Sequence, residues 1–295
     1  MSIFKGVATA LITPFKESGV NGEVDYASLE RLVNAQLKAG INALVVLGTT
    51  GEPTTMTHDE RISVAKRVFE IVDGAVPIIF GAGSNNTYTA AEYAIEGEQL
   101  GAKAVLTVTP YYNKCTQNGI VKHFEAIAEK ITVPIIAYNV PGRTGVNIEV
   151  DTVKKLKAIK GVVAIKEASG QIKQFTGIAP LCDKNFALYS GDDDLTYTAL
   201  TLGGEGIISV ASNVIPGEML SITKAFFNGE YKKARDIQFS LADVNKYLFS
   251  EVNPIPVKFA AKHFGLISDD YLRLPLTRIS DDNAAKLTAS LAKIF

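Results

Sequence analysis

The sequence predicts an α/β fold, a (β/α)8 TIM barrel followed by a helical extension at the carboxyl end. Two observations support this prediction. Short apolar segments alternate with amphipathic segments up to Val210, and only helical patterns follow that residue. Eight strand–helix units in series are typical of a closed barrel of parallel strands. A doubly wound open sheet is the alternative, because it shows a similar alternation.

The apolar segments are short and rich in β-branched residues. We therefore expect strands that are buried on both faces, as in a parallel sheet. In chain order, the expected strands are Val7–Ile12, Ala43–Leu47, Val76–Phe80, Ala104–Val108, Pro134–Tyr138, Val162–Ile165, Phe186–Tyr189 and Gly206–Val210.

The segments between the strands have apolar residues at helical spacing, which predicts covering helices. Thr57 and Glu60 match a capping box and predict the start of a helix that runs through Ile71. Glycines precede several expected strands and should end the preceding helices, because glycine readily adopts the left-handed C-cap conformation. They are Gly40, Gly74, Gly101 and Gly161.

Four segments of the carboxyl-terminal part are helical in pattern. They are Leu220–Phe227, Tyr231–Phe249, Val257–Phe264 and Asn283–Ile294. Pro254–Pro256 is interpreted as a rigid connector. We divide the chain into a catalytic barrel at residues 1–225 and an extension at residues 226–295. No low-complexity linker separates the two parts, so we expect the extension to pack on the barrel.

Composition excludes several classes of function. The chain has 30 Lys and Arg against 31 Asp and Glu, without a basic stripe, so nucleic acid is not an expected partner. Cys115 and Cys182 lie far apart and suggest free thiols in a cytoplasmic protein. Met1–Gly6 lacks the apolar core of a signal peptide. No apolar segment approaches the roughly 20 residues that span a bilayer, so no membrane association is expected.

Polar groups follow several of the expected strands. Gly48–Glu52 follows the second strand, Thr109–Asn113 the fourth and Tyr138–Gly145 the fifth, while Lys166 ends the sixth. Barrel enzymes build their active sites at the carboxyl ends of the strands. We therefore expect hydroxyls, phenols, a guanidinium and an amine to meet at one face.

Lys166 is the most informative of these residues. Burial at the end of a strand disfavours the ammonium form, and a neutral amine can attack a carbonyl to form a Schiff base. The alternative is a structural lysine that is paired with a carboxylate such as Glu167.

The other groups also have structural alternatives. Gly48–Glu52 could be only a tight turn, Tyr112 and Tyr138 could be packing aromatics, and Arg143 could form a surface ion pair. Their joint occurrence at one face favours a site. An arginine in such a turn is suited to bidentate capture of a carboxylate.

Metal and nucleotide sites have weaker support. Gly81–Asn86 lacks the third glycine of a dinucleotide-binding loop. Asp192–Asp194 could bind a metal, but it precedes an apolar helical segment, so we interpret it as a helix cap. The three histidines show no metal-ligand spacing; they are His58, His123 and His263. These patterns give little support for a metal site or a nucleotide site.

Four motifs resemble those of the dihydrodipicolinate synthase family. They are G-T-T-G-E at Gly48–Glu52, P-Y-Y-N at Pro110–Asn113, Y-N-V-P-G-R-T-G at Tyr138–Gly145 and K-E-A-S-G at Lys166–Gly170. The resemblance extends from Gly6 to Pro275 and includes N-P-I-P-V-K at Asn253–Lys258. The lysine and Y-N-x-P also occur in the wider superfamily of pyruvate-dependent aldolases, whereas G-R-T-G is much more specific.

The resemblance implies condensation of pyruvate with L-aspartate 4-semialdehyde, on the route to diaminopimelate and lysine. Lys166 would form the Schiff base with pyruvate, and Tyr138 would donate and accept protons. Neither a metal nor an organic cofactor would be needed, because the protonated imine would accept the electrons. Thr49 and Tyr112 would complete a hydroxyl relay. In family members this second tyrosine comes from the neighbouring subunit, and the resemblance favours a homotetramer built as a dimer of dimers.

The resemblance also implies the substrate-binding residues. Thr50, the backbone at Ile208 and Gly191 would hold pyruvate, and Arg143 would receive the carboxylate of the semialdehyde. Two alternatives remain at this stage. N-acetylneuraminate lyase and keto-deoxy-sugar acid aldolases share the lysine and tyrosine but generally lack the arginine. A keto-acid sensor could lose the tyrosine relay, which is present here.

Feedback inhibition by lysine is expected to be weak. Seven positions match the effector site of lysine-sensitive family members: Pro53, Thr54, His58, Arg61, Asn85, Thr89 and Tyr111. Thr89 replaces a glutamate that would face an ammonium group of the effector. Arg61 replaces a histidine and adds a positive charge beside a cationic ligand.

Overall fold

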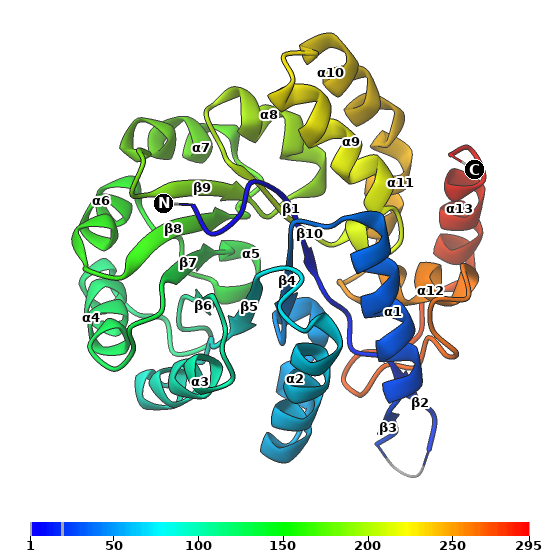
Figure 1. Ribbon diagram of the computed structural model, residues 1–295, viewed down its shortest axis with the longest axis horizontal. Helices are drawn as coiled ribbons and strands as arrows, with labels where there is room; N and C mark the ends of the chain where they lie inside the picture. The colour runs from blue at the N-terminus through cyan, green and yellow to red at the C-terminus, as the bar shows by residue number, and fades with distance from the viewer. Residues whose placement is uncertain (1, 19–20, 295) are drawn as a thin grey trace.

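Eight parallel strands close into a barrel in the computed structural model of the chain (Figure 1). The structure describes residues 2–18 and 21–294. Around the barrel the order is β1 (Gly6–Ala10), β4 (Ala43–Val46), β5 (Ile78–Gly81), β6 (Ala104–Val108), β7 (Ile135–Asn139), β8 (Val162–Glu167), β9 (Ala187–Ser190) and β10 (Gly206–Ser209). The closed order confirms the (β/α)8 prediction, because a doubly wound sheet would leave two open edges.

Helices cover the outside of the barrel (Figure 1). They are α1 (Tyr26–Ala39), α2 (His58–Val72), α3 (Thr87–Gln99), α4 (Gln117–Ala128), α6 (Val150–Ala158), α7 (Ile172–Ile178), α8 (Thr196–Thr201) and α9 (Pro216–Phe227). The capping box at the start of α2 is confirmed. The Thr57 side chain accepts a hydrogen bond from the Glu60 amide, and the Glu60 side chain accepts one from the Thr57 amide.

Two hydrophobic cores result from the alternation of side chains along the strands. Ala164 of β8 lies in the inner core with Ile136 of β7, whereas Ile165 lies in the outer core beneath the helices. Because the period is two residues, Lys166 faces the interior of the barrel together with Ala164. At the amino end of β1, Phe4 fills this interior and stacks on Tyr189 with ring centroids 4.3 Å apart.

The extension contains α10 (Tyr231–Ser240), α11 (Ala242–Leu248), α12 (Ile255–His263) and α13 (Asp281–Leu291). The segment Tyr231–Phe249 is helical as expected, but it forms two helices, because Leu241 separates α10 from α11. The prediction of a rigid connector at Pro254–Pro256 was wrong. Pro256 instead occupies the first turn of α12, where the missing N–H of proline is not needed.

The expected boundary after residue 225 lies inside α9, which continues to Phe227, and we propose to place it after that residue. The outer ends of the two expected parts, Met1 and Phe295, lie outside the described residues.

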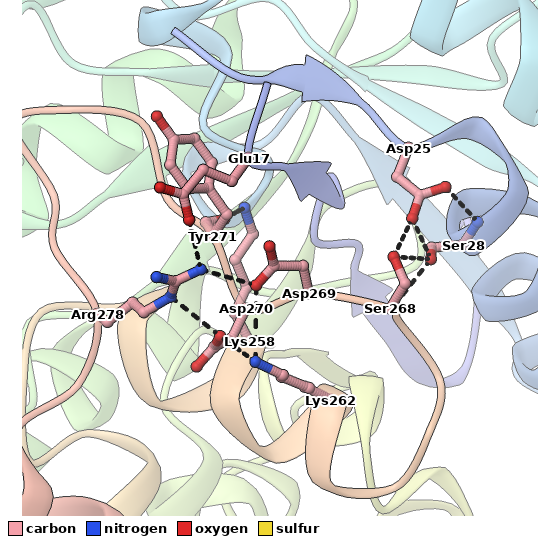
Figure 2. Close-up of polar contacts among 10 residues, drawn as sticks. All are labelled: Glu17, Asp25, Ser28, Lys258, Lys262, Ser268, Asp269, Asp270, Tyr271 and Arg278. Carbon is pink, nitrogen blue, oxygen red and sulfur yellow. Dashed lines mark hydrogen bonds and ion pairs between the residues drawn. The ribbon is translucent and has the colours of Figure 1, made fainter. Parts of the chain in front are cut away.

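The extension contacts the amino-terminal part of the chain through a polar cluster (Figure 2). A short hairpin of β2 (Phe15–Lys16) and β3 (Glu23–Val24), which sequence patterns did not indicate, precedes α1. The Asp25 carboxylate accepts hydrogen bonds from Ser28 and Ser268. Arg278 pairs with Glu17 on the hairpin side, with one guanidinium nitrogen 3.2 Å from a carboxylate oxygen. These contacts hold the extension against the barrel.

The described residues include no helix that is both long and apolar enough to cross a membrane. Within the same residues, no group of three or more His, Cys, Asp or Glu side chains is arranged to hold a metal ion.

His123 should make stability dependent on pH. This side chain of α4 is only 3% exposed, its Nδ1 lies 2.9 Å from the Thr87 hydroxyl, and burial lowers its pKa to about 4. In the unfolded chain the pKa is about 6.5. Between these values the unfolded state binds more protons, so the free energy of unfolding should fall as pH falls from about 6.5 to 4.

Urea unfolding of the wild type and His123→Gln at pH 7, 6 and 5, at one protein concentration, would measure this effect. The free energy of unfolding of the variant should change less with pH than that of the wild type, by up to about 1.4 kcal/mol per pH unit. His263→Gln is the control, because His263 is exposed. Equal slopes for the wild type and His123→Gln would contradict the prediction.

Candidate active site

A hollow of about 240 Å³ lies at the carboxyl ends of β4, β5, β6 and β7. Its lining includes Thr49, Tyr111, Tyr138 and Arg143. Parallel strands bring their carboxyl ends to the same edge, so loops that are far apart in the sequence meet here. The structure thus brings together several of the predicted site residues.

Lys166 and Tyr138 occupy paired positions on neighbouring strands, β8 and β7. Both side chains are buried, with 5% and 7% exposure. The Lys166 amine lies 4.2 Å from the centroid of the Tyr138 ring. Lys166 is not among the described residues that line the hollow, but Tyr138 lines it and contacts the amine. Strand register therefore places an amine directly beside a phenol.

Burial lowers the pKa of the Lys166 amine to about 8. The carboxylates of Asp192 and Asp193 raise this pKa in opposition, and the charge of Arg143 lowers it further. With a pKa near 8, about one amine in ten is neutral at pH 7, far more than for an ordinary lysine with a pKa of about 10.4. The amine is therefore available as a nucleophile near neutral pH.

The alternative of a Lys166–Glu167 pair does not match the contacts. The Glu167 carboxylate instead accepts hydrogen bonds from the Asn139 side chain at 2.8 Å and the Ser169 amide at 2.7 Å. Among the described residues, no ion pair joins Glu167 to Lys166. Glu167 orders the backbone after β8 and leaves the amine free for chemistry.

The Tyr138 phenol keeps its proton at neutral pH. Burial raises its pKa to about 12, while the charge of Arg143 and a side-chain hydrogen bond with Thr49 lower it. Thr49 begins the 3-10 turn η1 (Thr49–Gly51), which follows β4. The phenol and the Thr49 hydroxyl are therefore joined by a hydrogen bond at the carboxyl edge of the barrel.

Asn253 of the extension links two predicted substrate-binding residues. Its side-chain amide donates to the Thr50 hydroxyl at 2.9 Å, and its backbone carbonyl accepts from the Arg143 guanidinium at 2.9 Å. Arg143 lies in α5 (Pro141–Thr144), a single helical turn where the sequence indicated only a turn. The extension thus holds both side chains at the rim of the barrel.

The predicted helix cap at Asp192–Asp194 was wrong, because none of these side chains caps the following turn. The Asp193 carboxylate instead accepts from the Ser209 hydroxyl at 2.5 Å and the Val210 and Ala211 amides at 3.0 and 3.1 Å. Burial raises the pKa of Asp193 to about 6, and these donors lower it in opposition. The carboxylate secures the carboxyl end of β10.

Gly191 lies beside the Lys166 side chain, and Ile208 lies in the interior of the barrel. The Gly191 amide donates to the Glu167 carbonyl at 2.7 Å, and a Cβ at this position would lie 2.7 Å from Cε of Lys166. Ile208 is in the inner core on β10, directly after Ile207. Only glycine leaves space for the lysine side chain at position 191.

Tyr112 is separate from the rest of the site in this chain. Its side chain is 92% exposed, and its backbone has φ 70°, which is unusual for a residue other than glycine. Tyr111, and not Tyr112, is among the described residues that line the hollow. Strain of this kind persists only where another constraint maintains it.

Comparison with known proteins agrees with this geometry. The model of the dihydrodipicolinate synthetase family matches residues 3–294. The chain belongs to this family. It is 45% identical to 4-hydroxy-tetrahydrodipicolinate synthase of Alkaliphilus oremlandii over 291 residues, covering 99% of each chain. It is 47% identical to the synthase of Thermotoga maritima over 283 residues, covering 95% of each.

Solved structures of the family have the same fold. Dihydrodipicolinate synthase from Thermotoga maritima superposes with a TM-score of 0.95 at 45% identity, covering 99% of each chain. Dihydrodipicolinate synthase from Cyanidioschyzon merolae, solved with lysine bound, superposes with a TM-score of 0.94 at 40% identity, covering 99% of each. The named relatives favour the synthase over the sugar-acid aldolases and the keto-acid sensor.

Sequence patterns alone did not predict the contacts that Asn253 and Asp193 make beside the candidate site. For Asn253 the only signal was its place at the start of N-P-I-P-V-K, and no pattern connects it to Thr50 or Arg143. For Asp193 the acidic triplet was visible, but its partners lie on β10. Both contacts are made only after the barrel closes.

Gly191→Ala should reduce turnover at least tenfold. The added methyl group would lie 2.6 Å from the Ala168 Cβ and 2.7 Å from Cε of Lys166, so the lysine must shift. Overpacking of this kind also costs about 1–3 kcal/mol of stability. Steady-state kinetics and thermal unfolding would measure both effects. Gly217→Ala is the control, because no atom lies within 4 Å of its added Cβ. Unchanged turnover in Gly191→Ala would refute the steric argument.

Proposed function

We propose that the chain acts as a lyase that condenses pyruvate with L-aspartate 4-semialdehyde, the 4-hydroxy-tetrahydrodipicolinate synthase reaction. The supporting observation is the buried Lys166 amine, 4.2 Å from the ring centroid of Tyr138, at the carboxyl edge of the barrel. The amine has the pKa and the position of a Schiff-base nucleophile.

The neutral Lys166 amine attacks the ketone carbon of pyruvate, and loss of water gives a protonated imine. This cation withdraws electrons from the methyl carbon, which then releases a proton to form an enamine. The enamine attacks the aldehyde carbon of the second substrate and forms the new carbon–carbon bond. The amino group of the semialdehyde then attacks the imine carbon, and the carbon–nitrogen bond to Lys166 breaks, which closes the ring and returns the free amine. These reaction steps need neither a metal nor an organic cofactor, because the protonated imine accepts the electrons.

Tyr138 transfers the protons of these steps. A phenol with a pKa of about 12 is a poor base by itself. Its hydrogen bond with Thr49 allows a proton to leave along hydroxyls without a full charge on the phenol. Acid–base assistance of this kind contributes roughly 10²–10⁴ in rate.

The carboxylates of the two substrates bind on different sides of the imine. Thr50, Gly191 and the backbone at Ile208 hold pyruvate, whose reacting carbon must reach Lys166. Arg143 lines the hollow and receives the carboxylate of the semialdehyde. A charge-assisted contact of this kind contributes about 1.5–3 kcal/mol.

The proton path continues through Tyr112 of a second copy of the chain. Its 92% exposure and positive φ support this role, because the side chain projects away from its own barrel. The active unit is therefore a dimer, and two such dimers form a tetramer. The enzyme works in the cytoplasm, where the two free thiols, Cys115 and Cys182, remain reduced.

Borohydride reduction in the presence of pyruvate is the direct test of the proposed reaction. It should attach a stable adduct to the tryptic peptide that contains Lys166, because the reagent reduces an imine to an amine. Lys166→Ala should abolish trapping and keep the fold, whereas Lys155→Ala, at an exposed position of α6, should trap normally. Peptide mass spectrometry identifies the site. Labelling of another lysine would remove Lys166 from the mechanism.

Mixing Tyr112→Phe with Lys166→Ala subunits tests the shared relay. Each variant alone should be nearly inactive, but a hybrid dimer contains one site with an intact lysine and an intact tyrosine. Activity should therefore return to a fraction of the wild-type value. Native mass spectrometry measures the hybrid fraction. Hybrids that form and remain inactive would show that the relay lies within one chain.

Lysine at millimolar concentration should leave activity nearly unchanged. Arg61 is 5% exposed, and its guanidinium lies 4.0 Å from the centroid of the Tyr93 ring, so a fixed positive charge occupies the effector region. Thr89 provides no carboxylate for the ammonium group of the lysine effector, and Arg61 repels it. Together these two changes should weaken the binding of lysine at least tenfold.

The inhibition constant for lysine would measure this effect. The double variant Arg61→His with Thr89→Glu should become at least tenfold more sensitive. A wild-type constant below about 1 mM, a free energy near −4 kcal/mol, would show that the effector site still works.

A further inference from the structure

A buried ion pair connects the extension to the turn that carries the catalytic hydroxyls. Glu52 directly follows η1 and has φ 53°, so it lies in the left-handed region between η1 and η2 (Pro53–Thr55). Its carboxylate pairs with the ammonium group of Lys258 in α12. The two side chains are 1% and 0% exposed. Fully buried glutamate and lysine are rare in proteins, and they are almost always paired.

Lys258 is held from several directions. Its ammonium group donates to the Tyr271 carbonyl at 3.1 Å, and both residues appear in Figure 2. The same nitrogen lies 4.2 Å from the centroid of the Phe15 ring. The lysine is therefore fixed between α12, the following loop and the amino-terminal hairpin, and it presents a rigid partner to Glu52.

Arg273 provides a second anchor for the same segment. Its guanidinium donates to the Thr55 carbonyl at 2.9 Å and pairs with both Glu60 carboxylate oxygens at 2.6 and 2.8 Å. The guanidinium carbon lies 4.3 Å from the Phe15 centroid. Two cations of the extension thus hold the ends of η2, one at Glu52 and one at Thr55.

Stability alone does not explain the Glu52–Lys258 pair. Burying two charges costs several kcal/mol per ion, and replacing such a pair with well-packed apolar residues is often neutral or stabilising. Neither residue is among the described residues that line the hollow. The pair is instead attached to the backbone that directly follows η1, the turn that contains Thr49 and Thr50.

We propose that the Glu52–Lys258 pair positions η1 so that the Thr49 hydroxyl meets the Tyr138 phenol and the Thr50 hydroxyl meets its substrate. This inference rests on the proposed function for its kinetic consequence. Glu52 and Lys258 are positioning residues, since neither contacts the reacting atoms. The extension then contributes to turnover through a rigid charge pair as well as through the contacts of Asn253.

Three variants test the proposal: Glu52→Gln, Lys258→Met and the double variant. Each single variant leaves one buried charge without its partner and should lower the melting temperature strongly. The double variant removes both charges and should recover most of the lost stability. It should nevertheless show at least a tenfold lower kcat and a changed pH profile, with a smaller effect on the KM for pyruvate.

Lys293→Met is the matched control, because it breaks an exposed ion pair of the same extension. The side chains of this pair, Lys293 and Asp243, are 68% and 54% exposed. This variant should leave kcat, the pH profile and the melting temperature unchanged. A double variant with wild-type melting temperature, kcat and pH profile would overturn the proposal and leave the pair a purely structural role.

Amide hydrogen exchange separates this inference from the proposed function. Exchange at residues 49–55 should become faster in the double variant than in the wild type, whereas exchange in α6 should not change. If wild-type enzyme does not trap pyruvate, the proposed reaction fails, yet the exchange experiment still tests positioning. Unchanged exchange at residues 49–55 would overturn the positioning role whatever the reaction.

Discussion

The register between β7 and β8 is the constraint on which the site depends. Pairing of Tyr138 with Lys166 directs both side chains into the barrel, since paired residues of parallel strands face the same side. A shift of one residue would turn the amine toward the covering helices. The outer core at Ile165 and the inner core at Ala164 prevent such a shift, because each side chain is buried on its own face.

Burial and nearby charges together set the pKa of the Lys166 amine. Burial lowers the pKa of Lys166, while the acidic groups of Asp192 and Asp193 limit the decrease to a value of about 8. Asp193 also secures the end of β10, so one carboxylate has an electrostatic and a structural effect. The same burial raises the pKa of Tyr138 and keeps its proton in place.

The extension contacts residues of the candidate site although it lies outside the barrel strands. Asn253 contacts Thr50 and Arg143, and Lys258 neutralises Glu52 at the end of η1. Polar residues at the rim would otherwise be mobile, because loops make few buried contacts of their own. The buried contacts of Lys258 and Asn253 join these loops to the extension, and such support limits the freedom of side chains on loops.

The order of strands, the closed barrel and the position of Lys166 could be predicted from the sequence, because apolar periodicity and strand ends are local patterns. The family motifs likewise contained Tyr138, Arg143 and Thr49 in short segments. Tertiary structure alone decided the partners of Glu167 and Asp193, the joining of Asn253 to Arg143 and the Glu52–Lys258 pair. Many of these contacts join residues far apart in the sequence, and their energies depend on burial that only the closed barrel creates.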